Sequence, residues 1–154
     1  WKKERGSGVN RPTLDPRPKR RLDRRMKART VSSDQLQFRV RNQIQFAYLL
    51  NEDTPFTGRM ENFYENGQMQ SEGSYKDGKA DGLWTLWSSD GLKIQEWVYE
   101  DFKPWTVVGW KPNGEKCPVT NVKDGNGVVA AYHADGTESF PRRLTFKDGE
   151  PVKE

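Results

Sequence analysis

The chain has 154 residues and a net charge of +4, which suits one domain with a tail and excludes two full domains. Hydrophobic residues make up only 32 %, yet there are six Trp, five Tyr and seven Phe, so we expect large rings to cover a thin sheet instead of filling a thick core. The single Cys117 excludes an intrachain disulfide, and with only His133 to join it no structural zinc site is predicted. The longest wholly apolar runs, such as Val128 to Tyr132, have five residues, whereas a membrane-spanning helix needs about 20.

Residues 1–34 are predicted to form an extended basic arm. Residues 1–30 hold twelve Lys or Arg against three Asp or Glu, a charge of +9, whereas the remaining residues hold 14 basic and 19 acidic groups, a charge of −5. The stretch from Arg11 to Arg29 contains three prolines and almost no apolar side chain, so it cannot offset its own ordering entropy. It is either a solvated, disordered leader or a segment that a partner holds in place. The expected partner-binding residues of the arm are Arg17, Lys19, Arg20, Arg21, Arg24, Arg25, Lys27 and Arg29.

Three kinds of partner suit such an arm: an acidic surface of another protein subunit, an anionic membrane surface, or nucleic acid. Nucleic acid ranks lowest, because after Trp1 the arm offers no ring before Phe38 on which a base could stack. Trp1 followed by Lys2 and Lys3 resembles the aromatic and basic edge of a membrane interface. Because the chain begins at Trp1 and not at Met, a signal peptide or transmembrane helix before it stays open, and so does the compartment, a membrane surface or the cytoplasm.

Residues 35–55 are expected to open the sheet. Apolar side chains occupy even positions over fifteen residues, separated by Gln and Arg, which predicts one or two strands. These apolar residues are Leu36, Phe38, Val40, Ile44, Phe46, Tyr48 and Leu50. Asn51 to Pro55 would then turn the chain into the first repeat.

Residues 56–150 contain nine Asn-Gly or Asp-Gly pairs, of which seven fall at regular spacing and are strong turn signals. The glycines at 67, 91, 114 and 136 are 24, 23 and 22 residues apart, and positions 78, 102, 125 and 149 are 24, 23 and 24 apart. Two interleaved turn series predict a repeat of about 23 residues with two strands and two turns. Such pairs favour type I′ hairpin turns. The predicted fold is all-β: an elongated, twisted, antiparallel meander of repeated hairpins in a single-layer sheet, followed by a tail at 151–154.

Between the turns, short ring-rich segments have the length of strands. They are residues 59–64, 68–75, 83–88, 92–99, 105–111, 116–122, 128–133 and 142–146. In residues 68–75, Met69 and Tyr75 lie at odd positions and polar residues lie at the even positions, which indicates a strand with one face exposed to solvent. Phe102 replaces a turn glycine, and we expect that hairpin to be remodelled because positive φ is costly for Phe. Pro118 interrupts a strand, which indicates an edge or a bulge.

Part of this pattern resembles a known family. The stretches are Thr54-Pro-Phe-Thr-Gly58, Phe63-Tyr-Glu-Asn-Gly67 and Ser71-Glu-Gly-Ser-Tyr-Lys-Asp-Gly-Lys-Ala-Asp-Gly-Leu-Trp-Thr-Leu-Trp87. They resemble the MORN-repeat variant of YwqK-like bacterial proteins, which are described as antitoxins of toxin–antitoxin systems. The resemblance covers about 95 of the 154 residues. It implies an elongated twisted β-sheet used for protein contacts, with membrane association in some members.

No set of residues predicts catalysis, so we expect a protein that is not an enzyme and has no cofactor, no metal and no small-molecule substrate. His133 ends a predicted strand, and Cys117 has no neighbouring base in the sequence. The most distinctive set is five tryptophans within 27 residues: Trp84, Trp87, Trp97, Trp105 and Trp110. We expect roughly half of these rings to pack the repeat and the others to form a docking face.

These features favour an interaction or scaffold subunit of a larger assembly, with membrane association left open. The β-repeat would dock through a ring-rich face, and the arm would contact an acidic partner. Two alternatives are an antitoxin-like neutralising protein and a nucleic-acid-associated assembly protein.

Overall fold

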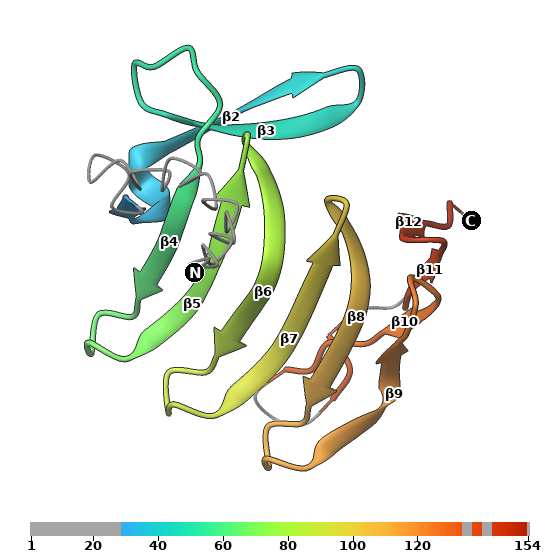
Figure 1. Cartoon of the computed structure of the whole chain (residues 1–154). Helices are drawn as coiled ribbons and strands as arrows, with labels where there is room; N and C mark the ends of the chain where they lie inside the picture. Colours follow the sequence, from blue (N-terminus) through green and yellow to red (C-terminus); the bar gives the residue numbers. More distant parts are fainter. Residues whose placement is uncertain (1–28, 134–136, 140–142, 154) are drawn as a thin grey trace, which may run out of the picture.

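The computed structural model describes residues 29–133, 137–139 and 143–153, and the predicted arm residues from Arg17 to Lys27 lie outside these ranges. The described chain forms a seven-stranded, a three-stranded and a two-stranded sheet (Figure 1). In chain order the elements are β1 (Thr30–Val31), the 3-10 helix η1 (Ser33–Gln35), β2 (Leu36–Arg41), β3 (Ile44–Leu49), β4 (Gly58–Phe63), β5 (Met69–Lys76), β6 (Lys79–Trp87), β7 (Lys93–Glu100), β8 (Lys103–Trp110), β9 (Lys116–Val122), β10 (Gly127–Val129), β11 (Leu144–Lys147) and β12 (Glu150–Pro151). The predicted all-β class is confirmed.

The strands from β4 to β9 follow one another in chain order as antiparallel hairpins, which confirms the predicted meander. Only β1 departs from this order, because it pairs parallel with β4 at one edge of the sheet. At the other edge lies β9, where the pairing register shifts opposite the segment that holds Pro118, as its proline predicts. Across the described residues, no helix has the length and hydropathy to span a membrane.

The two series of turns have different backbone conformations. The turns after β5 and β11 have two residues that both adopt positive φ, for example Asp77 at 50° and Gly78 at 80°, as predicted for type I′. The turns after β4, β6 and β8 are one residue longer. There the Tyr64 carbonyl accepts a hydrogen bond from the Gly67 N–H at 2.9 Å, and Gly67 alone has positive φ, 82°. This is a type I turn closed by a glycine bulge, so the type I′ prediction is wrong for this series.

The turn between β7 and β8 keeps the two-residue form although Phe102 replaces the glycine. Asp101 has φ 46° and Phe102 has φ 64°, close to the values of the Asp-Gly turns. The expected remodelling is therefore wrong for the turn itself, although the pairing of the β7–β8 hairpin shifts register between Val98 and Tyr99. Because a bulky side chain at positive φ costs about 1 kcal/mol or more, the strands on both sides must hold the turn in this conformation.

Residues 36–49 do form two strands, but these strands do not open the main sheet. Among the strands of the described chain, β2 and β3 pair only with each other and form a separate hairpin, although Tyr48 of β3 also bridges Pro55. The two-residue turn of the hairpin has Asn42 at φ 51° and Gln43 at φ 66°. The register places Phe38 opposite Ala47 and Arg39 opposite Phe46. Because the turn has two residues, the even-numbered side chains of β3 point to the opposite face of the hairpin from the even-numbered side chains of β2. The apolar positions consequently lie on both faces of the hairpin.

The main sheet buries one face, and two segments outside the β4–β9 meander cover it at its ends, the β2–β3 hairpin and the β10–β12 sheet. The residues of β10 and β11, predicted to continue the meander, leave the main sheet instead. Near β4 the core consists of Val31, Leu36, Ala47, Leu49, Phe56 and Met60, with Tyr75 and Trp84 packed against it. Near β9 a second core consists of Val107, Val122, Val129 and Phe146, with Trp97 packed against it. Trp84 pairs directly with Trp97, and Trp97 pairs with Val107, so both cores lie on the same face.

Candidate functional site

A row of aromatic rings crosses this face from one core to the other. Tyr75 and Trp84 meet edge to face with centroids 5.0 Å apart, and Trp84 lies 6.4 Å from Tyr99. Trp97 stacks on Tyr99 at 6.3 Å and meets Phe146 edge to face at 6.0 Å. The row begins at Phe56, 6.1 Å from Tyr75. These separations lie in the range of favourable aromatic pairs, so the rings form one continuous packed layer.

The two tryptophans of the row are fixed by the backbone below them. The Trp84 indole covers Gly73, where an added Cβ would lie 2.0 Å from the ring. Its Nε1–H donates to the Ser74 carbonyl at 3.0 Å, and the Trp97 Nε1–H donates to the Gln95 side-chain oxygen at 3.1 Å. Because both indole N–H groups bond within the protein, Trp84 and Trp97 belong to the packing of the sheet.

An open groove of about 560 Å³ lies where the three sheets meet, and we call it the aromatic groove. The β2–β3 hairpin contributes Phe38 and Ile44, the β5 and β6 strands contribute Tyr75 and Ala80, and the far wall comes from Pro104, Phe146 and Pro151. Figure 1 shows the hairpin at one side of this region and β12 at the other, with the β5–β6 and β7–β8 turns between them. The size is typical of a binding site.

The two lysines of the aromatic groove and Glu150 already have partners, and Asp101 is the fourth charged residue that lines it. Lys79 Nζ lies 5.2 Å from the Phe46 ring centroid and 4.7 Å from the Phe102 ring centroid, so one ammonium bridges the hairpin and the β7–β8 turn. Lys103 Nζ pairs with Glu150 at 2.8 Å. Burial, and then the neighbouring Tyr99, raise the pKa of Tyr75 to about 12. The groove therefore offers mainly apolar surface to a ligand.

Phe102 is the unusual residue of this site. It combines positive φ with a large ring that is 37 % exposed and that borders the groove. A glycine would satisfy the same turn without strain. Strained residues cluster at functional sites, so the position of Phe102 indicates a role for its ring.

The structure does not gather the five predicted tryptophans on one surface. All five are half-buried, and only Trp84 and Trp97 are neighbours in the aromatic row. Trp110 lies under the Lys93 ammonium at 5.4 Å, beside a smaller hollow formed with Tyr64 and Leu92. Of the other two, Trp87 ends β6 and Trp105 is the third residue of β8. The Trp87 carbonyl accepts the Tyr64 hydroxyl at 2.7 Å, and the Trp105 carbonyl accepts the Gly125 N–H at 2.9 Å.

Arg29 is the one predicted arm residue inside the described ranges. Its carbonyl accepts a hydrogen bond from the Arg59 N–H at 2.9 Å, and its guanidinium lies 3.4 Å from the Glu52 carboxylate. Both partners belong to this chain. The arm therefore enters the fold along β4, next to β1.

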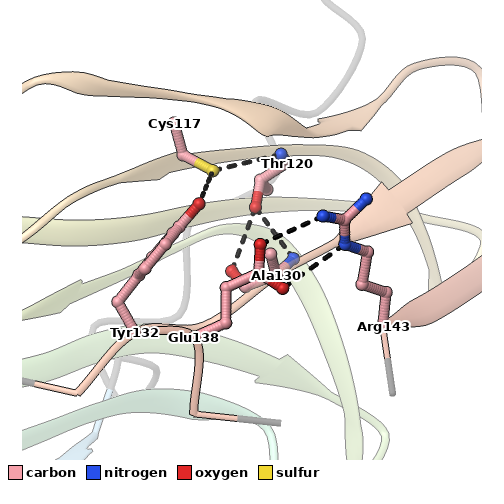
Figure 2. Close-up of polar contacts among 6 residues, drawn as sticks. All are labelled: Cys117, Thr120, Ala130, Tyr132, Glu138 and Arg143. Carbon is pink, nitrogen blue, oxygen red and sulfur yellow. Dashed lines mark hydrogen bonds and ion pairs between the residues drawn. The ribbon is translucent and has the colours of Figure 1, made fainter. Parts of the chain in front are cut away.

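A polar cluster fastens the C-terminal segment to β9 (Figure 2). The Thr120 hydroxyl donates to the Ala130 carbonyl and accepts from the Ala130 N–H, each at 3.0 Å, while the Tyr132 hydroxyl lies 3.1 Å from Cys117 Sγ. Burial raises the pKa of the Cys117 thiol, but the hydrogen bonds from Tyr132 and Thr120 outweigh it and lower the pKa. The hydrogen bond to Cys117 raises the pKa of Tyr132 to about 12. Cys117 is buried, so this cluster joins two segments instead of facing a substrate.

Sequence reasoning missed Phe38, Phe102 and Phe146 as site residues, because segments far apart in the chain bring them together. The one local signal was Phe102, which stands where the other turns of its series have glycine. Within the described ranges, no group of three or more His, Cys, Asp or Glu side chains is placed to hold a metal ion.

Comparison with protein-family models, with curated proteins and with solved structures finds no match to this chain. The resemblance to the MORN-repeat variant therefore stays a prediction, and so does the absence of catalysis.

Proposed function

We propose that this protein is a non-enzymatic interaction subunit whose aromatic groove binds an extended apolar segment of a partner protein. The observation that supports this most directly is Phe102, a strained and exposed ring at the border of the groove. Phe38 at 46 % and Ile44 at 47 % exposure add apolar surface on the hairpin side. Exposed rings around a preformed hollow are typical of interface hot spots.

The shape and charge of the groove favour a polypeptide over a polar metabolite. The groove is an open channel bordered by turns and strands from three sheets. Its lysines are taken up by ring contacts and by Glu150, so few groups are left to orient a small charged molecule. An extended peptide with large apolar side chains would cover the exposed rings and exclude water.

The basic arm would supply a second contact to the same partner. Its charge of +9 over residues 1–30 suits an acidic surface next to the apolar segment. Two linked contacts bind more tightly than either alone, because the second forms within an existing complex. We therefore expect a salt-sensitive contribution from the arm and a salt-insensitive one from the groove.

Phe102→Gly tests this function. Glycine fits the positive φ of the turn, so we expect the free energy of unfolding to stay within about 1 kcal/mol of the parent or to rise. Partner binding should nevertheless fall by tenfold or more, because the variant removes an exposed ring that the partner segment would cover. Phe63→Ser is the matched control, since Phe63 is 56 % exposed on β4 and does not line the groove.

The measurement has two stages. The full chain and both variants are used to co-purify proteins from the source cells at low and at high salt, with and without nuclease. The protein that the parent and Phe63→Ser retain is then titrated against all three chains. Equal binding by Phe102→Gly would contradict the proposal, and so would binding that disappears with nuclease treatment.

A further inference from the structure

Strand β2 has one edge that no other strand of the described chain pairs with. β3 faces the main sheet, where the Ala47 N–H donates to the Gly78 carbonyl at 2.7 Å and the Ala47 carbonyl accepts the Phe56 N–H at 2.8 Å. β2 lies on the far side of the hairpin, and in the described chain it pairs with β3 alone (Figure 1). An open strand edge is a template for another strand.

The hydrogen-bond pattern between β2 and β3 determines which backbone groups of β2 face outward. The Leu50 N–H donates to the Gln35 carbonyl at 3.0 Å, so the odd residues of β2 direct their N–H and C=O groups toward β3. The outward bonds of Ala47 agree, since Ala47 pairs with Phe38. Phe38 and Val40 therefore present N–H and C=O groups to the open edge, and Leu36 presents its C=O, because its N–H bonds Ser33.

The side chains at this edge are apolar and accessible. Val40 is 70 % exposed and Phe38 is 46 % exposed, although strand residues of this kind are usually covered. Natural proteins protect free edges with charges or with bulges. Here the two arginines of β2 partly cover Tyr48 instead, with the Arg39 guanidinium 4.4 Å and the Arg41 guanidinium 5.5 Å from its ring centroid.

We propose that this edge is a homodimer interface, at which the β2 strands of two copies pair antiparallel about a two-fold axis at Phe38. In that register Phe38 lies opposite Phe38 of the second copy, and Leu36 lies opposite Val40. Phe38 then pairs with Phe38 of the other copy through both its N–H and its C=O, and the Val40 N–H meets the Leu36 carbonyl of the other copy. The four-stranded sheet β3-β2-β2-β3 would bury the exposed apolar pairs.

The charges disfavour the register with its axis at Arg39, and the match of β2 with itself favours a second copy as the occupant. A two-fold axis at Phe38 places Arg39 opposite Gln37 and brings Arg41 level with Gln35, beside Asp34 in the sequence. An axis at Arg39 would set two guanidinium groups opposite each other, and like charges in that position destabilise a strand pair. The sequence of β2 is thus complementary to itself in one register and not in the next.

Sedimentation velocity on the full chain, over a concentration series from low to several hundred micromolar, tests the interface. We expect a reversible monomer–dimer equilibrium. Val40→Lys should weaken it by roughly tenfold or more, because each dimer loses two apolar pairs and gains two charges at the contact. Leu83→Lys, which adds the same charge to an exposed leucine on β6, should leave the equilibrium unchanged.

Cysteine substitutions test the register. Phe38→Cys should form a disulfide-linked dimer on mild oxidation, because opposite residues of paired strands lie within bridging distance, whereas Arg39→Cys should not. The native Cys117 is 2 % exposed and does not compete. Cross-linking of Arg39→Cys alone would overturn the register. A monomer throughout the series, a dimer that Val40→Lys does not weaken, or a dimer that forms only after removal of residues 1–28 would overturn the interface.

The dimer proposal and the proposed function can be tested independently of each other. Val40 does not line the aromatic groove, and Phe102 is not part of β2. Val40→Lys should therefore retain the partner protein, while Phe102→Gly should retain the dimer.

Discussion

The β2–β3 hairpin and the β10–β12 sheet cover the same face of the main sheet at opposite ends, and they do so by different means. The C-terminal segment is fastened by the two hydrogen bonds between Thr120 and Ala130, and it buries Phe146 against Trp97. The hairpin buries Ala47 and Leu49 but leaves Phe38, Val40 and Ile44 exposed.

The comparison shows which segments complete the core of the main sheet. The β4–β9 meander has too few apolar residues to close its own face, so segments outside it complete the core. The C-terminal cover buries Phe146 and leaves Leu144 44 % exposed. The hairpin leaves three large apolar side chains exposed, and under the proposed function part of this surface would bind the partner.

Replacing one buried and one exposed phenylalanine tests this contrast with the largest expected effect. Phe146 is 8 % exposed, so Phe146→Ala should lower the free energy of unfolding by about 3 kcal/mol. Phe38→Ala should cost about 1 kcal/mol, because nearly half of that side chain is already in water. Urea denaturation of both variants gives the comparison. Equal losses would mean that the two covers contribute alike.

Thr120→Val tests the polar fastening of the C-terminal cover. The valine keeps the shape but leaves the N–H and C=O groups of Ala130 without the hydroxyl, which should cost about 2 kcal/mol. Thr106→Val is the control, since Thr106 is half-buried on β8 in the same sheet. Thermal unfolding followed by circular dichroism measures both, and a small effect of Thr120→Val would show that burial alone holds this cover.

Alkaline pH should loosen the hairpin side of the row. The folded pKa of Tyr75 is about 12 and its ordinary value is 10.0, so the unfolded chain loses this proton first. The contribution of Tyr75 is complete below pH 10 and is lost as pH rises toward about 12. We expect the Tm of the parent to fall over this range more steeply than that of Tyr75→Phe. Parallel curves would show that Tyr75 does not titrate differently on folding.

The smallest effect is expected at the outer edge of β2. Val40→Ser should change the free energy of unfolding by less than about 0.5 kcal/mol at concentrations where the chain is monomeric, because Val40 is mostly exposed. A loss above 1 kcal/mol in dilute urea titrations would mean that another part of the same chain covers this edge.

The regular part of the fold could be predicted from the sequence because its signals are local. The Asn-Gly and Asp-Gly pairs marked the turns, and the segment 116–122 was placed with the boundaries that β9 has. The type of turn was harder to predict. The same dipeptide serves both turn series, and one additional residue, such as Glu65 before Asn66-Gly67, decides between them.

The site could not be predicted because its residues meet only through the arrangement of the three sheets. The apolar side chains at even positions of residues 36–50 predicted strands correctly. The two-residue turn at Asn42 and Gln43, however, places the even-numbered side chains after the turn on the other face of the hairpin. The sequence singled out Phe102 in place of a turn glycine, but the cost of positive φ for Phe was expected to change the turn conformation. Instead the flanking strands hold the turn, and the ring stays at the groove.

The order of strands in the main sheet also determines how such a protein can change length. From β4 to β9 each strand pairs with its neighbours in the sequence, so one two-strand unit can be added or removed without rethreading the chain. The hairpin and the β10–β12 sheet would then move apart or together by the width of two strands. The number of repeats thus sets the length of segment that the groove can hold, independently of the residues that line its two walls.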